Sequence, residues 1–460
     1  MTQQSEPVPA RRATGKGTLY FFGALGGILF GYDLGVISGV LLFIKTKSVF
    51  DLGSVGQGVV GGCLAAGAII GAAIAGRLTD RPGRRRTIMI GATIFAIGTI
   101  GCTFAPNATT FVIFRFIVGI AVGATSATVP TYLSELAPSR VRGALSSLNQ
   151  LMIVSGILIA YIVDWALQGS ANWRAMIAIG IIPAAVLLFG MTLLPETPRW
   201  LIKQGREDEA RVVIRSAQGQ VDIDAEVTGI REVIRLDGDQ GSLKDLFTKW
   251  VRPMLVVALI LAVGQQLSGV NAINLYAPTI FKNLGVGTSA SLLASIVLGT
   301  VKVAFTAWVI FMVDRWGRKP LLLLGNVLMS ATLILLGISV TVLSHNPSGA
   351  AITTIILLVI YLAGYELGWG AVVWVMMSEV FPLKVRAVGM GTSSVVLWAA
   401  TFAITFVFPV MDNGIGLANS AYIFAGIGII LFLLVAKFVP ETKGRSLEQI
   451  ELDLRDRVKV

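Results

Sequence analysis

Long apolar stretches separated by short polar segments dominate the pattern along the chain. A helix needs about 20 mainly apolar residues to span a membrane. Helix is predicted for every such stretch, because lipid offers the backbone no hydrogen-bonding partner. Twelve stretches qualify: 19–44, 56–76, 87–105, 111–133, 146–168, 174–194, 255–281, 290–313, 320–343, 351–377, 387–411 and 419–438. The pattern therefore predicts an all-α membrane protein with twelve transmembrane helices.

One longer polar segment, 199–250, interrupts this series. Its mixed charges and spaced Val, Ile and Leu residues predict short amphipathic helices. It divides the chain into five predicted parts: a tail at 1–18, a six-helix half at 19–198, a linker at 199–250, a second six-helix half at 251–438 and a tail at 439–460.

Composition agrees with a membrane protein. Only 14% of the 460 residues are charged, 55% are hydrophobic and the mean hydropathy is +0.78, whereas soluble domains carry about 25% charged residues. The net charge of +11 does not indicate nucleic-acid binding, because the basic residues recur in short clusters between spans. Alternate connections such as 77–86 hold these clusters, which predicts that both termini are cytoplasmic. Two cysteines inside apolar runs and one histidine predict no metal site, and no cofactor is expected.

Three motifs occur twice, about 240 residues apart. They pair GRLTDRPGRRR (76–86) with VDRWGRKP (313–320), YLSELAPSRVRGAL (132–145) with VMMSEVFPLKVRAVG (375–389), and LLPETPRW (193–200) with FVPETKGR (438–445). The repetition predicts two homologous halves, and transporters built this way place their substrate between the halves near the bilayer midplane.

These motifs, together with QQLSGVN at 265–271, resemble the sugar porters of the major facilitator superfamily. Bacterial monosaccharide–proton symporters and animal glucose facilitators are its relevant members. The resemblance runs from about residue 19 to 446. One departure is Pro82, where the family usually has another residue; proline predicts an extended Arg81 and a stiff turn.

Charged residues at membrane depth indicate function by default. Four such residues are Asp33, Arg115, Lys302 and Glu366. In proton-coupled relatives, the positions of Asp33 and Arg115 hold the proton-binding carboxylate and its arginine partner. The alternative is a static ion pair that locks the first helix to the fourth. Gly27, Gly31, Gly35 and Gly39 recur every four residues and predict a close helix contact on the side away from Asp33.

Amides and aromatic rings suit a sugar, because amides match hydroxyl groups and rings stack on its C–H faces. The resemblance places Gln150, Gln265, Gln266, Asn271 and Trp374 in the sugar site; Asn274, Tyr276 and Thr401 are further candidates. A broken seventh helix near Gly269 would bring Gln266 and Asn271 together. The alternative role for these amides is to bond neighbouring helices.

Lys302 stands where the family usually has a sugar-binding asparagine, and Thr401 where it has another. Glu366 matches the acidic position of the facilitators. We expect Lys302 and Glu366 to interact directly or through a ligand, because a lone ammonium in the bilayer costs at least about 2.5 kcal/mol. Snorkelling of Lys302 to the membrane surface is disfavoured, because it lies about a dozen residues from either helix end.

Charges at the cytoplasmic helix ends are expected to form a gate, as in the family, beside their role in setting topology. The predicted gate residues are Asp80, Arg84, Glu135, Arg142, Glu196, Asp314, Arg318, Glu379, Arg386 and Glu441.

The sequence therefore predicts a proton-coupled monosaccharide transporter of the bacterial plasma membrane, functional as a monomer. A passive facilitator and a polyol–proton symporter remain open. A sugar sensor and a drug exporter are disfavoured by the short tail and the motif set. An enzyme is disfavoured because the chain has neither a phosphate-binding P-loop nor a histidine within a span.

Overall fold

A computed structural model describes residues 16–136, 142–218, 222–237, 242–370 and 372–443, and these residues form helices with no strand. Five long helices open the chain: α1 (Lys16–Ile44), α2 (Ser54–Asp80), α3 (Arg84–Thr103), α4 (Ala108–Leu136) and α5 (Arg142–Leu167). After the short η2 (Gln168–Ser170), the sixth span consists of α6 (Trp173–Ala178) and α7 (Ile181–Leu193). Four short helices follow: α8 (Pro198–Lys203), α9 (Glu207–Gln218), α10 (Ile223–Asp237) and η3 (Leu243–Phe247).

The second half contains interrupted spans. Its elements are α11 (Arg252–Leu267), α12 (Val270–Asn283), α13 (Thr288–Trp316), α14 (Arg318–Val342), α15 (Pro347–Tyr365), the π-helical turn η4 (Glu366–Gly370), α16 (Val372–Val380) and α17 (Leu383–Phe438). Helices α11 and α12 form one span, and α15, η4 and α16 form another.

Within the described residues, eleven helical segments are long and apolar enough to cross a membrane. The last covers 54 residues, about 80 Å of helix at 1.5 Å per residue, which exceeds the roughly 30 Å of hydrocarbon in a bilayer. Gly416 interrupts it with a φ of 82° and a ψ of 164°, so α17 contains two crossings. The predicted all-α fold with twelve spans in two halves agrees with this structure.

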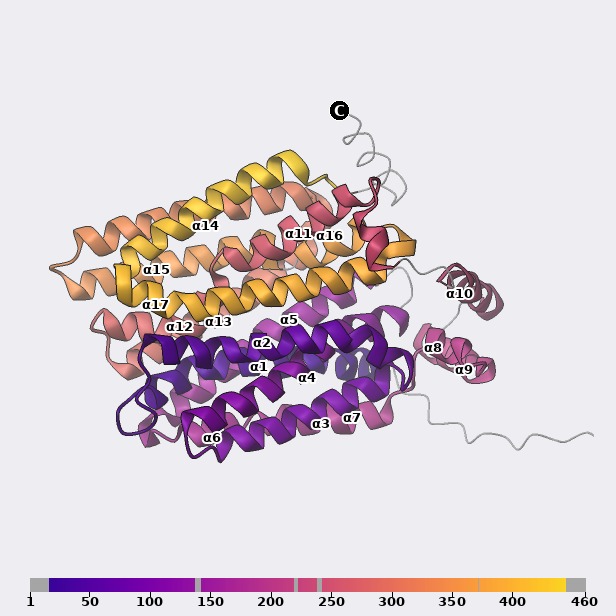
Figure 1. Cartoon of the computed structure of the whole chain (residues 1–460), viewed down its shortest axis with the longest axis horizontal. Coiled ribbons are helices and arrows are strands. Elements are labelled where there is room, and N and C mark those ends of the chain that lie inside the picture. Colours follow the sequence, from indigo (N-terminus) through magenta and orange to yellow (C-terminus); the bar gives the residue numbers. More distant parts are fainter. Residues whose placement is uncertain (1–15, 137–141, 219–221, 238–241, 371, 444–460) are drawn as a thin grey trace, which may run out of the picture.

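The two halves lie side by side. In Figure 1 the first half, indigo to purple, lies below the second, which runs from rose through orange to yellow. They meet where α1 contacts α12, α2 contacts α17 and α5 contacts α13. Helices α8, α9 and α10 lie at one end of the bundle, which we call the linker end; the opposite end is the far end.

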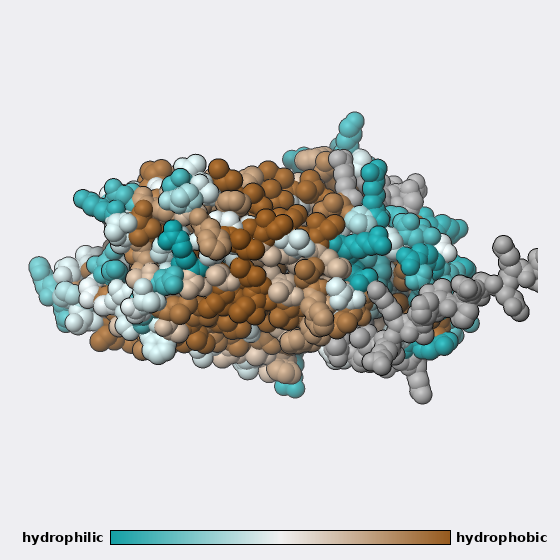
Figure 2. Space-filling model, turned by 90° about the horizontal axis from the view of Figure 1, so that it is seen from below, coloured by the Kyte–Doolittle hydropathy of each residue, from teal (hydrophilic) through white to brown (hydrophobic). Residues whose placement is uncertain are grey.

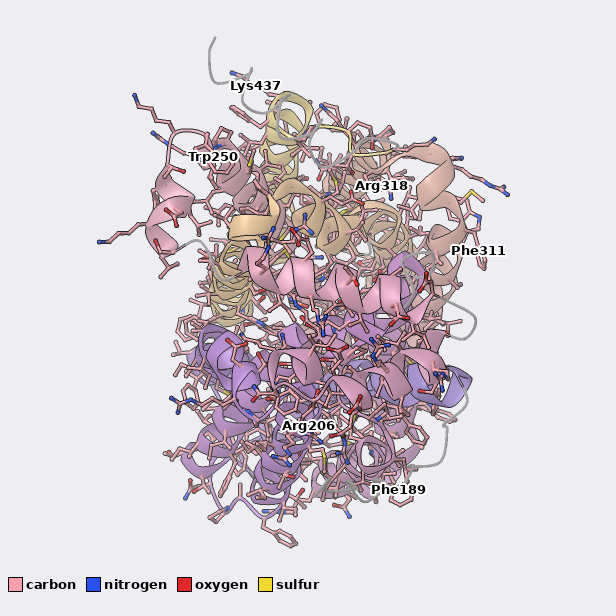
Figure 3. All side chains as sticks on the ribbon, turned by 90° about the vertical axis from the view of Figure 1, so that its right-hand side faces the viewer. Phe189, Arg206, Trp250, Phe311, Arg318 and Lys437 are labelled. Carbon is pink, nitrogen blue, oxygen red and sulfur yellow. The ribbon has the colours of Figure 1, made fainter. Side chains whose placement is uncertain are left out.

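The surface matches a membrane environment. On the face seen in Figure 2, brown apolar residues cover the middle of the molecule and hydrophilic residues gather toward both ends. Phe189 and Phe311 are 64% and 72% exposed, and both lie at the outer edge in the end-on view of Figure 3. Large apolar side chains in such positions suit contact with lipid.

The turn between α2 and α3 corrects the expectation for Arg81. Its φ and ψ are −85° and −63°, so it continues the helical geometry of α2 despite the following Pro82. The neighbouring Gly83 reverses the chain with a φ of 94°, a conformation that glycine adopts readily. Because Gly83 makes the turn, Arg81 does not need to become extended.

Candidate functional site

The glycine face of α1 packs directly on α5. A Cβ at Gly31 would collide with the backbone carbonyl of Ile153, and one at Gly39 would collide with Asp164. The predicted close contact is confirmed, and it fixes the rotation of α1. Asp33, about 200° around the helix from Gly31 at 100° per residue, therefore faces away from α5.

Asp33 instead forms a buried ion pair with Arg115 of α4. Arg115 Nη1 lies 3.1 Å from Asp33 Oδ1, and Nη2 lies 3.2 Å from Oδ2. The two residues are only 6% and 3% exposed, so little water screens the charges. Such a two-pronged contact is strong and directional. A proton on Asp33 would compete directly with the guanidinium for this carboxylate.

The seventh span breaks at Gly269, as expected. Gly269 has a φ of 94° and separates α11 from α12. Across the break, Asn271 donates a hydrogen bond to the Gln266 side chain. Gln266 donates to Gln265 at 3.2 Å, and Gln265 donates to the Trp369 carbonyl of η4 at 2.7 Å. The three amides therefore form one chain that connects the broken span to η4.

Lys302 and Glu366 interact directly. Their Nζ and Oε1 atoms lie 3.5 Å apart. Lys302 also donates to Asn274 Oδ1 at 3.1 Å, and Thr306 donates to Glu366 Oε2 at 3.1 Å. The Gln150 side chain of α5 approaches the same carboxylate from the other half. A charge-balanced cluster thus lies between α12, α13, η4 and α5.

Thr401 and Trp374, two further predicted sugar-binding residues, differ in their contacts. Thr401 is buried on α17, and its hydroxyl donates to the Leu397 carbonyl of its own helix at 2.9 Å. Trp374 lies half-buried on α16 and packs against the hydrophobic core. Trp374 therefore remains partly accessible, whereas the Thr401 hydroxyl is engaged within its own helix.

Tyr276 and Tyr161 connect the two halves toward the far end. The Tyr276 hydroxyl of α12 lies 3.2 Å from the Gln57 carbonyl of α2 and 2.9 Å from the Thr405 carbonyl of α17. The Tyr161 hydroxyl of α5 donates to the Asn274 carbonyl of α12 at 2.9 Å. We call these contacts the tyrosine latch. Tyr276 therefore uses its hydroxyl to join helices.

At the linker end, corresponding ion pairs lie within each half. In the first half, Arg84 Nη2 lies 3.1 Å from Glu135 Oε1, and its Nη1 lies 3.9 Å from Asp80 Oδ1. In the second half, Arg318 Nη2 lies 3.7 Å from Glu379 Oε1. The repeated motifs thus build the same local pairing twice (Figure 3 labels Arg318).

The two PET glutamates bind helix N-termini. Glu196 accepts hydrogen bonds from the first two backbone N–H groups of α3 at 3.1 Å, and Glu441 accepts from those of α14 at 3.0 Å. Burial raises the pKa of Glu196 above its usual value, although backbone N–H groups oppose the rise. For Glu441, burial acts in the same direction, but hydrogen bonds led by the Lys443 N–H lower the pKa overall.

Three predicted gate residues remain: Arg386, whose side chain the structure describes, and Arg142 and Asp314, whose side chains it does not. Arg386 Nε donates to the Phe381 carbonyl at 3.1 Å. The side chains of Arg142 and Asp314 lie outside the described residues.

Three further residues, Asp164, Thr306 and Tyr161, make buried contacts that the sequence pattern did not predict. Asp164 on α5 is fully buried, and its Oδ2 accepts the Gly39 N–H at 3.1 Å. The rule that identified Asp33, a charge inside an apolar run, would also have found Asp164. Thr306 and Tyr161 carry no comparable signal, because a hydroxyl is common in membrane helices.

Comparisons with known proteins agree with this architecture. The family model described as "Sugar (and other) transporter" matches residues 19–454. The putative metabolite transport protein YwtG of Bacillus subtilis is 47% identical over 439 residues, covering 95% of this chain and 95% of the relative. A D-xylose transporter of Levilactobacillus brevis is 44% identical over 450 residues, covering 96% and 97%. A partially occluded, inward-open structure of the xylose transporter XylE from E. coli matches with a TM-score of 0.81 and 31% identity, covering 94% and 99%.

The chain therefore belongs to the sugar transporter family of the major facilitator superfamily. It is a multi-pass membrane transporter and not an enzyme.

Proposed function

We propose that this protein takes up a monosaccharide together with a proton across the bacterial plasma membrane. The buried Asp33–Arg115 pair carries the proposal, because it couples one titratable carboxylate to the contact between α1 and α4. Protonation of Asp33 would release Arg115, and that rearrangement would favour one state of the carrier over another. XylE, which this chain resembles, is described as a proton:xylose symporter.

The sugar would bind between the halves, beside the amide chain of Gln265, Gln266 and Asn271 and near Gln150 and Trp374. These groups offer both donors and acceptors to hydroxyls, and a ring to a C–H face. Lys302, Glu366 and Asn274 would complete the site from α12, α13 and η4. A hexose or pentose is the proposed substrate, and a polyol is the alternative. We propose that one chain suffices for transport.

The linker end would face the cytoplasm, with both termini on that side. The structure would then represent a state closed to the outside by the latch bonds that cross between the halves, from Tyr161 to Asn274 and from Tyr276 to Gln57. Ion pairs that cross between the halves at the linker end would close the opposite state.

The test is uptake into proteoliposomes with an imposed pH gradient. With one proton per sugar, a gradient of one pH unit supports about tenfold accumulation, because it supplies about 1.4 kcal/mol. Asp33→Asn should lose this accumulation and keep counterflow, the exchange of labelled for unlabelled sugar. Counterflow is the control for folding and sugar binding. Undiminished accumulation by Asp33→Asn would rule out the proposed coupling and favour another proton-binding group.

A passive facilitator is the main alternative function. It would equilibrate sugar at every pH gradient, with no accumulation by the wild type. The experiment therefore separates the two functions without identifying the natural sugar in advance, provided that a panel of hexoses, pentoses and polyols is tried.

A further inference from the structure

Among the residues that the structure describes, two buried carboxylates are each paired with a cation, one in each half. Asp33 pairs with Arg115, and Glu366 pairs with Lys302. All four side chains are almost completely enclosed. A symporter that moved one proton per sugar would need only one of these carboxylates to change its protonation.

Burial disfavours the ionised form of Glu366, and contacts with specific neighbours oppose that cost. Lys302 supplies the opposite charge, Thr306 donates a hydrogen bond to the carboxylate, and the Gln150 side chain approaches it from α5. The phenol ring of Tyr365 also faces the pair, with the Lys302 ammonium 6.0 Å from the ring centroid, and Tyr361 lies next to Tyr365. Lys302 is therefore the charged side chain that balances Glu366.

Lys302 is held in place for this role. It lies halfway along α13, and Asn274 of α12 fixes its ammonium group at 3.1 Å. Snorkelling would require it to abandon both Asn274 and Glu366. Because Lys302, Asn274 and Glu366 all belong to the second half, the pair can stay intact while the two halves move.

Gln150 is different, since it reaches Glu366 from the first half. Movement of the halves would therefore change the environment of Glu366 during each cycle. A carboxylate without a cation would bind a proton when enclosed and release it when water entered. Without Lys302, Glu366 would thus become a second proton carrier.

We propose that Lys302 is a built-in counter-ion that keeps Glu366 ionised throughout the transport cycle and confines proton coupling to Asp33. This inference rests on the proposed symport, and it assigns Lys302 a role in setting the number of protons moved per sugar. Neutral replacement of Lys302 should raise that number from one to two.

The experiment measures a null point, the pH gradient at which net sugar flux stops against a fixed tenfold sugar gradient. Membrane potential is held at zero in the proteoliposomes. Because the null point is thermodynamic, it does not depend on how fast a variant works. One proton per sugar gives a null point at about one pH unit, and two protons give about half a unit.

We expect a null point at about one pH unit for the wild type and for Lys302→Arg, and at about half a pH unit for Lys302→Gln. The matched double variant Lys302→Gln/Glu366→Gln should return to about one unit, because position 366 can then no longer carry a proton. Lys302→Met serves as a second neutral replacement if Lys302→Gln does not fold. A null point unchanged from the wild type in a transporting Lys302→Gln or Lys302→Met variant would overturn the proposal, as would one that stays shifted in the double variant.

Failure of the proposed symport would be recognised separately. If net sugar flux through the wild type stops only when the sugar concentrations on the two sides are equal, whatever the pH gradient, the protein is a passive carrier. In that background, a neutral Lys302 variant whose null point responds to pH would still support the role assigned to Lys302, and one that does not respond would overturn it.

Discussion

Buried aspartates are stable only when their environment compensates the charge or removes it. Asp33 and Asp164 meet this requirement in different ways. Asp33 is held by the two nitrogens of Arg115. Asp164 accepts the Gly39 N–H while lying fully buried between α1 and α5. A neutral Asp164 would satisfy the same contact as an ionised one, so its proton need not move during transport.

Asp164→Asn should therefore retain proton-driven accumulation. The asparagine carbonyl can accept the same Gly39 N–H, and its size matches the space that Gly39 leaves for it. We expect accumulation within about twofold of the wild type, because the hydrogen bond is preserved. Uptake under a pH gradient, measured beside Asp33→Asn, checks this. Loss of accumulation with intact counterflow would instead identify Asp164 as a proton carrier.

Residues that carry charge were the easiest part of the site to predict. Asp33, Arg115, Lys302 and Glu366 stand out because charge is rare in membrane helices, and the structure pairs them as expected. Tyr161 could not be predicted in the same way. Its contact with the Asn274 carbonyl depends on how two distant helices approach, which a local sequence pattern does not contain.

At the scale of helices, the PET glutamates act through backbone groups. Glu441 accepts the N–H groups at the start of α14, where the helix dipole also favours a negative charge. Its lowered pKa means that it contributes stability above the usual glutamate pKa. That contribution is lost as the pH falls through the lowered value in the folded protein.

Glu441→Gln should lower the apparent Tm of the detergent-solubilised protein at neutral pH, by the equivalent of about 1 kcal/mol. The difference from the wild type should shrink as the pH falls below the usual glutamate range. Glu196→Gln is the matched control in the other half. Because burial raises the pKa of Glu196, replacing it with a neutral amide should lower the Tm less than Glu441→Gln does at neutral pH. Equal losses for the two variants would contradict this difference.

Most helices could be predicted from the length of the apolar stretches alone, but only some of the breaks within them could. The break at Gly269 was predictable, because the polar residues on both sides needed to converge. The polar segment before residue 419 likewise predicted a division near Gly416. The π-helical turn at Glu366–Gly370 was not predicted. Such a turn arises from packing: Gly325 of α14 would strike the Gly364 carbonyl, and Gly368 would strike the Leu321 carbonyl, if either carried a side chain.

At the scale of the whole molecule, the contacts between the halves are polar toward the far end. The Tyr161 and Tyr276 hydroxyls bind backbone carbonyls of the opposite half, and Gln168 donates to Ser289 at 2.9 Å. Neutral hydrogen bonds of this kind contribute about 1 kcal/mol each. They can therefore hold one state without making the opposite state inaccessible, which alternating access requires.

Removing one latch hydroxyl should shift the carrier toward opening at the far end. Tyr161→Phe keeps the ring and loses only the bond to Asn274, so the closed population should fall by about fivefold relative to the open one. Distances between spin labels on the far ends of α5 and α12, measured by pulsed electron paramagnetic resonance, report this shift. Tyr32→Phe is the matched control, because the Tyr32 hydroxyl donates to Met176 within the same half at 2.6 Å. If both variants gave the same distances as the wild type, Tyr161 would contribute packing rather than closure, and the latch would depend on Tyr276 alone.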